Sequence, residues 1–360
     1  MGVVMKDILY QQSKRIEGLD LIRTFAIFCV ILVHCFRELF PLGNIEYFSS
    51  LPAVSKIFYF VCYAAGALGV PLFFILSGYL LLSRDYDEFN TKKFYKRNLL
   101  AILITWEIWI PISNLISTFF YDIPFHWSTL LRNMLFVEQV NLGPSWYMPV
   151  ILGIYIFIPY LSRVLKTMSS KEILLTFSIS YIYFFIIPTL NHLKAIQWGS
   201  VLDLHFSGGL YGIYVILGYL LHKYEDQLKS SYKWSFIVVI SFISMIFYQK
   251  LAYQLKNEIF NMWYDICLLP IITISIFVLC KEMKFSRFRK LITAISKCSF
   301  GMYLTHMIFI LTFSKYGFLN FIASEELRIL LLTITVFVVS FVFVMLLSKL
   351  PKLGRILVRC

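Results

Sequence analysis

The sequence predicts an all-α fold, a polytopic bundle of transmembrane helices with about ten spans and both termini in the cytoplasm. The first observation is composition, because 59% of the 360 residues are hydrophobic and only 15% are charged. Soluble domains are about one-quarter charged, so this chain has too few polar residues to cover a soluble core. The second observation is a series of apolar segments of bilayer length. The third is the uneven distribution of Lys and Arg between the connecting segments.

Apolar segments recur along the whole chain, each near the length of about 20 residues that crosses a bilayer. The segment at 234–249 is shorter than the others. The predicted spans are 19–37, 57–82, 99–120, 144–162, 173–190, 204–222, 234–249, 262–280, 295–314 and 329–348. No repeat or linker divides them. We therefore expect one integral-membrane domain over residues 1–360, with cytoplasmic tails at 1–18 and 349–360.

The basic residues support this arrangement. When the N-terminus is placed inside and ten spans alternate, 24 of the 33 Lys and Arg residues fall on the inside and 8 on the outside, while Arg23 lies within the first span. Cytoplasmic loops carry such an excess. The net charge of +13 is then explained by loops that face anionic lipid. We therefore expect the lipid bilayer, and not nucleic acid, as the partner of these charges.

The seven cysteines have no CxxC or Cys/His spacing typical of a zinc site. Most lie in apolar runs, where Cys behaves as a small hydrophobic residue. We therefore expect no disulfide framework and no metal. The N-terminal stretch MGVVMKDILYQQSKRIEG lacks the short apolar core and cleavage site of a signal peptide, so the first span is expected to be uncleaved.

The first span, LDLIRTFAIFCVILVH, carries three ionisable residues, Asp20, Arg23 and His34. Arg23 and His34 are 11 positions apart, so they lie within about 20° of each other on one helix face and about 16 Å apart along its axis. Asp20 precedes Arg23 by three positions and shares that face. An arginine at the bilayer centre costs at least about 2.5–3.5 kcal/mol, so this face is expected to line the bundle interior or a wet cavity. Alternatively, Arg23 extends to the lipid phosphates beside Asp20, and His34 is a hydrogen-bonded core residue.

On these residues the chain resembles the acyltransferase 3 family of integral-membrane acyltransferases, whose first span carries Arg-x10-His, often after Leu-Asp. Further segments resemble family motifs in the family's order, namely GVPLFFILSGYLLL (69–82), PSWYMPVILGIYIFIPYL (144–161), GLYGIYVILGYLL (209–221) and CSFGMYLTHMIFIL (298–311). One region departs from the pattern. Many members have Arg-x-x-Arg where the third span begins, whereas KKFYKRNLLAIL has Ala101 in place of the second arginine.

The resemblance implies transfer of an acyl group, usually acetyl, from cytoplasmic acyl-CoA to a hydroxyl of a cell-surface polysaccharide or lipid-linked glycan. It also implies a multi-pass protein of the cell (plasma or inner) membrane, with acetyl-CoA as co-substrate. An alcohol needs a base to remove its proton, and the neutral imidazole of His34 suits that role near pH 7. Arg binds phosphate through two parallel hydrogen bonds, so Arg23 is expected on the acyl-CoA side. Lys93, Lys96 and Arg97 are expected to assist it.

Two further spans contain candidate site residues. Ser77 and Gly78 either contribute a hydroxyl to the site or serve close helix packing, which is the commoner use of small residues in membranes. Glu107 is costly within the third span unless it is paired. It is expected to pair with Arg23 or Arg97, or else to contact substrate.

The remaining candidates are aromatic or histidine residues. Trp146 and Tyr147 either line the acceptor site, because aromatic rings stack on sugars, or belong to an interfacial aromatic belt. Tyr303 and His306 match the late family motif and either line the site or form hydrogen bonds in the core.

Two other classes of function remain open. A transporter of saccharide or acyl donor also needs a polar path through a bundle, and a sensory membrane module is a third possibility. The sequence has no attached hydrolase-like domain, so we expect transfer to finish within the bundle or with a separate partner. Release of CoA distinguishes an enzyme from a transporter.

Overall fold

The computed structural model describes residues 15–40, 44–193, 202–204, 208–229, 231–256, 263–285, 287–351 and 353–360, without the side chains of Leu353 and Arg355. Over these residues the protein is helical and contains no strand. The predicted all-α membrane fold is therefore confirmed.

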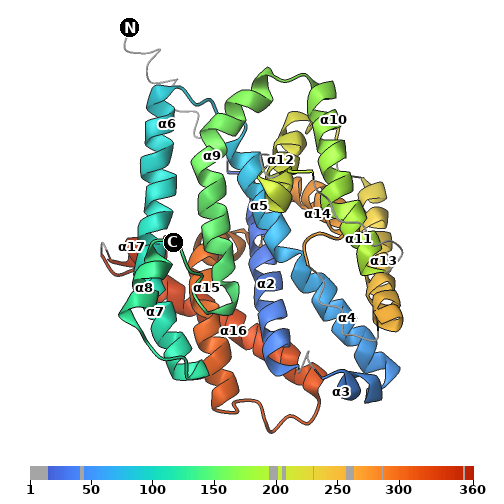
Figure 1. Cartoon of the computed structure of the whole chain (residues 1–360), viewed down its shortest axis with the longest axis vertical. Helices are drawn as coiled ribbons and strands as arrows, with labels where there is room; N and C mark the ends of the chain where they lie inside the picture. Colours follow the sequence, from blue (N-terminus) through green and yellow to red (C-terminus); the bar gives the residue numbers. More distant parts are fainter. Residues whose placement is uncertain are drawn as a thin grey trace.

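Figure 1 shows the helices in the order of the chain. In chain order they are α2 (Glu17–Leu39), α3 (Ile45–Ser50), α4 (Ala53–Ala67), α5 (Gly69–Leu81), α6 (Glu88–Phe94), η1 (Tyr95–Leu99), α7 (Leu100–Tyr121), α8 (Trp127–Met134), η2 (Gly143–Trp146), α9 (Tyr147–Thr167), α10 (Ser170–Tyr181), η3 (Ile182–Ile186), α11 (Ile187–His192), α12 (Gly209–Lys223), α13 (Tyr232–Lys256), α14 (Leu268–Lys281), α15 (Arg289–Lys315), α16 (Glu325–Ser348) and α17 (Leu353–Leu357).

Eight helical stretches in the described part of the chain are long and apolar enough to cross a membrane. They account for eight of the ten predicted spans, including 234–249, which forms part of the 25-residue α13. The predicted spans at 204–222 and 262–280 correspond to shorter helices, the 15-residue α12 and the 14-residue α14. The total of ten spans and the orientation in the membrane stay predictions.

Helix α2, the predicted first span, is the central helix of the bundle. It packs against α4, α5, α14, α15 and α16, and Figure 1 shows it among them. The face of α2 that carries Asp20, Arg23 and His34 is therefore inside the protein, where ionisable side chains avoid the cost of facing lipid.

The contact between α5 and α12 depends on glycine. A Cβ atom at Gly78 would overlap the carbonyl oxygen of Val215, and one at Gly218 would overlap that of Ile75. Small residues let membrane helices approach to backbone contact. Gly78 therefore serves helix packing in this structure, and its neighbour Ser77 is held facing the interior.

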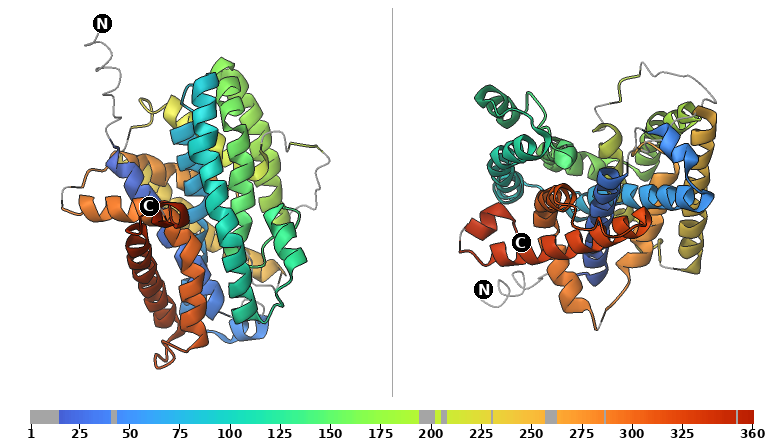
Figure 2. Two further views of the ribbon diagram at one scale, coloured as in Figure 1. Left: turned by 90° about the vertical axis from the view of Figure 1, so that its left-hand side faces the viewer. Right: turned by 90° about the horizontal axis from the view of Figure 1, so that it is seen from below.

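The C-terminal segment folds back onto the bundle, and Figure 2 shows the C-terminus lying against the other helices. The side chains of Thr105 and Trp109 donate hydrogen bonds to the carbonyl oxygens of Ile356 and Leu357, at 2.7 and 2.9 Å. Cys360 forms a disulfide with Cys298. The expectation of no disulfide framework missed this bond, because these cysteines are 62 positions apart and the return of the chain brings them together.

Candidate active site

Asp20 is buried at the start of α2 and is paired with Arg15, not with Arg23. The Nε and Nη2 atoms of Arg15 donate to its two carboxylate oxygens at 2.6 and 2.8 Å. The Ser296 hydroxyl donates to the same carboxylate at 2.7 Å, and Thr293 does so at 3.2 Å. Ser296 in turn accepts a hydrogen bond of 3.4 Å from Arg23 Nη1. The carboxylate therefore orients Arg23 through a hydroxyl and leaves the rest of its guanidinium free for a cavity.

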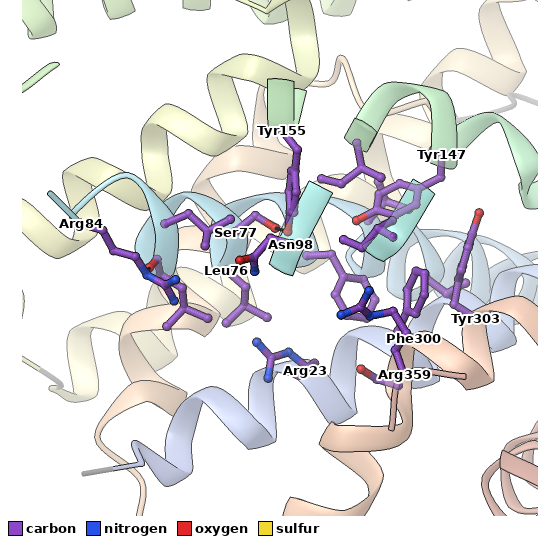
Figure 3. Close-up of a pocket in the computed structure, with 18 residues that line it drawn as sticks. Arg23, Leu76, Ser77, Arg84, Asn98, Tyr147, Tyr155, Phe300, Tyr303 and Arg359 are labelled. Atoms are coloured by element: carbon purple, nitrogen blue, oxygen red, sulfur yellow. Dashed lines mark hydrogen bonds between the residues drawn. The ribbon is translucent and has the colours of Figure 1, made fainter. Parts of the chain in front are cut away.

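That cavity, here called the inner cavity, has a volume of about 410 Å³. Three arginines line it, namely Arg23 from α2, Arg84 from the turn after α5, and Arg359 from the C-terminal segment. No acidic residue belongs to its described lining. Figure 3 shows Arg84 at one end and Tyr303 at the other. The three guanidinium groups therefore make the lining of the inner cavity strongly positive, which suits a ligand with several phosphates.

A second hollow of about 370 Å³ adjoins the inner cavity, since Arg23, Leu80 and Arg359 line both. Arg15 and Lys297 add two further positive charges to it, beside Asp20. It lies at the end of α2 that the basic residues predict to be cytoplasmic. These charges extend the positive surface from that side of the membrane to the inner cavity.

A separate cavity of about 320 Å³, here called the outer cavity, lies beyond the inner one along α2. His34 lines it together with the charged residues Arg37 and Glu38. Its wall is rich in aromatic rings, and the ring of Trp146 lies 5.3 Å from that of Trp263 between centroids. Aromatic faces next to a few polar groups suit a sugar, which has both apolar faces and hydroxyl edges.

His34 has a second histidine beside it. Its ring centroid is 5.2 Å from that of His306 on α15. His306 Nδ1 lies 2.7 Å from the carbonyl oxygen of Tyr303, so in a neutral ring this nitrogen carries the proton and donates. Nε2 of His306 is then an acceptor, and it is buried without a hydrogen-bond partner in the described structure. The two described rings are close but not hydrogen-bonded, and Nε2 of His306 is an acceptor that an N–H of His34 would satisfy.

The other predicted site residues divide into two groups. Ser77 lies on the inner cavity, Trp146 on the outer cavity, and Tyr147 and Tyr303 on both. The second group contributes nothing to the described lining of these three hollows, and it comprises Gly78, Lys93, Lys96, Arg97, Glu107 and His306.

The structure shows which contacts three residues of this second group make or lack. Arg97 is near the inner cavity only through its backbone, because its carbonyl oxygen accepts a 3.3 Å hydrogen bond from Arg359 Nη2. Lys93 lies on α6, with its ammonium 6.0 Å from the ring centroid of Phe89. Glu107 has neither Arg23 nor Arg97 as a salt-bridge partner in the described part of the chain.

Sequence reasoning missed two of the three arginines of the inner cavity. Arg84 follows directly after the predicted span at 57–82, and this place in a basic loop next to a candidate span is the signal that could have identified it. Arg359 lies in the C-terminal tail, where the sequence offers no signal. Long-range contacts bring it to the cavity, namely the hydrogen bonds of residues 356 and 357 to α7 and the disulfide of Cys360.

A comparison with protein families gives one match. A family model described as an acyltransferase domain matches residues 16–349, which is nearly the whole chain. No curated protein and no solved structure matches. The matched range includes His34, His306, Arg23 and Arg84, whereas Arg359 lies beyond it.

Proposed function

This chain belongs to the acyltransferase 3 family of membrane acyltransferases, and we propose that it transfers acetyl from cytoplasmic acetyl-CoA to a hydroxyl of a surface polysaccharide or lipid-linked glycan. The observation that carries this proposal is the pair of cavities along α2. Arg23 lines the positive inner cavity and His34 lines the aromatic outer cavity. Such a pair accepts a phosphorylated donor on one side and a sugar hydroxyl on the other.

The donor binds with its phosphates among Arg23, Arg84 and Arg359. Guanidinium groups remain charged and match phosphate oxygens with two hydrogen bonds each, and no acid in the described lining competes with them. Lys93, Lys96 and Arg97 are the alternative phosphate contacts for the part of CoA that stays outside the cavity. The thioester end then points along α2 toward His34.

His34 acts as the general base. Its neutral imidazole removes the proton from the acceptor hydroxyl, and the oxygen attacks the thioester carbonyl carbon. The tetrahedral intermediate then collapses, the carbon–sulfur bond breaks, and CoA leaves as a thiolate that takes up a proton from the imidazolium. The products are the acetyl ester and free CoA, and His34 is returned to its neutral form.

The test uses purified protein in lipid vesicles with radiolabelled acetyl-CoA and an acceptor glycan. We expect free CoA and labelled glycan in equal amounts, and we expect His34→Ala to lose both by about 100-fold or more, within the range of general base catalysis. His126→Ala is the matched control, because His126 is an exposed histidine outside the three hollows. Full transfer by folded His34→Ala would rule out the base role.

Transport is the competing function, because two cavities in line along one central helix also suit a path for a saccharide or an acyl donor. The same vesicles separate the two functions. A transporter moves glycan without releasing CoA, whereas the proposed enzyme releases CoA even when the glycan remains on one side.

A further inference from the structure

The inner and outer cavities share four lining residues, Val30, Val70, Tyr147 and Tyr303. We call this set the partition. Its members come from four helices, α2, α5, α9 and α15. Val30 lies between Arg23 and His34 on α2, about 10 Å from the first and about 6 Å from the second along the axis. The partition therefore stands between the proposed phosphate contacts and the proposed base.

The partition is tightly held on its aromatic side. The Tyr303 hydroxyl donates a hydrogen bond of 2.7 Å to the carbonyl oxygen of Pro144. The Tyr147 ring makes an edge contact with that of Tyr303 at 5.4 Å between centroids, and it lies 5.2 Å from the ring of Phe74. Neither tyrosine can swing aside without losing these contacts.

The aliphatic side is equally close-packed. Val30 and Val70 are only 3% and 9% exposed. A Cβ atom at Gly69 would lie 2.8 Å from Val30 Cγ2 and 2.6 Å from the carbonyl oxygen of Ala26, so α5 begins in backbone contact with α2. A valine side chain also has few rotamers. The methyl groups of these two valines therefore form the aliphatic half of the boundary between the two cavities.

We propose that the partition selects the acyl group by length, so that acetyl passes from the inner to the outer side and longer acyl groups are excluded. This inference rests on the proposed function, in which the thioester must reach His34 from the inner cavity. Close-packed interiors respond to a change of even one methylene. Propionyl and butyryl carry one and two methylenes more than acetyl, so each is rejected more strongly than the one before.

The test compares acetyl-, propionyl- and butyryl-CoA as donors for the wild type, Val30→Ala and Val70→Ala, with CoA release as the measurement. Each substitution removes two methyl groups, about the volume by which butyryl exceeds acetyl. We expect the ratio of kcat/KM for butyryl-CoA to that for acetyl-CoA to rise at least about 10-fold, since one methylene in an apolar site changes selectivity by about 10- to 200-fold.

Val336→Ala is the matched control, because Val336 is a fully buried valine of α16 that lines none of the three hollows. Its donor ratio should stay at the wild-type value. Two independent valines keep the test valid when one variant fails to fold. An unchanged ratio in a folded partition variant that still uses acetyl-CoA overturns the selector, whereas no CoA release by the wild type with any donor overturns the proposed function itself.

Discussion

Arg359 and Lys96, which lies on η1, are competing phosphate contacts at the scale of single residues. Arg359 lines the inner cavity, whereas Lys96 does not. Charge-assisted hydrogen bonds contribute about 1.5–3 kcal/mol each, so Arg359→Ala should raise the KM for acetyl-CoA by about 10- to 100-fold with a smaller change in kcat. Lys96→Ala should change it less than about threefold. Steady-state kinetics in vesicles measures both, and the reverse order of effects would favour the contacts that the sequence predicted.

His306 is expected to position His34. Its Nδ1–H is bonded to a carbonyl of its own helix and its Nε2 lies free beside the base. His306→Phe removes that acceptor and should lower kcat by about 10- to 100-fold, with the KM for acetyl-CoA unchanged and the pH profile of kcat altered. His306→Gln places a carbonyl oxygen near the same point and should recover part of the rate. Equal rates for the Phe and Gln variants would make His306 a packing residue only.

The polar stripe on α2 could be predicted because it depends on one helix alone. A spacing of 11 residues fixes the shared face of Arg23 and His34 from helix geometry. The inner cavity could not be predicted in the same way. Arg84 and Arg359 meet there across 275 positions of sequence, and that meeting depends on how separate helices pack.

Helices α5 and α12 provide a test at the scale of elements. Gly78→Val adds a branched side chain where a single Cβ already overlaps a backbone carbonyl. Overpacking of this kind costs about 1–3 kcal/mol, so the variant should lose several degrees of thermal midpoint in detergent, followed by tryptophan fluorescence.

The control for this prediction is Gly153→Ala on α9, where a Cβ atom would meet nothing within 4 Å. Alanine in a helix interior is about 0.5–1 kcal/mol better than glycine. This variant should therefore be as stable as the wild type or slightly more so. A Gly78→Val protein with an unchanged midpoint would mean that the two helices separate easily.

The helix boundaries also show which features of the fold a hydropathy pattern can predict. Long apolar runs predicted α2, α9 and α16 because each crosses the bundle as one helix. The predicted span at 57–82 is instead two helices, α4 and α5, that meet at Leu68. Hydropathy does not detect such a junction, because both helices are apolar. It matters for the site, since the junction brings Val70 to the partition.

Orientation is the property of the whole molecule on which the proposed function depends. Acyl-CoA is present in the cytoplasm, so the positive hollow around Arg23 and Arg359 must open there. The excess of Lys and Arg in the predicted inside segments favours this orientation, because positively charged loops are retained on the cytoplasmic side. The opposite orientation would present His34 to the cytoplasm and the inner cavity to the outside, where no acyl-CoA is available.

Cysteine labelling of whole cells tests this orientation. His126→Cys lies on the exposed loop before α8, in the predicted outside segment, and Lys92→Cys lies on α6, in the predicted inside segment. A membrane-impermeant maleimide should label the first variant in intact cells and the second only after permeabilisation. Both substitutions are made in a Cys267→Ser, Cys280→Ser background, because these two free cysteines are partly exposed whereas Cys29, Cys35 and Cys62 are buried. Labelling of Lys92→Cys alone in intact cells would show the opposite orientation. It would contradict the proposed transfer from a cytoplasmic donor to an outer hydroxyl.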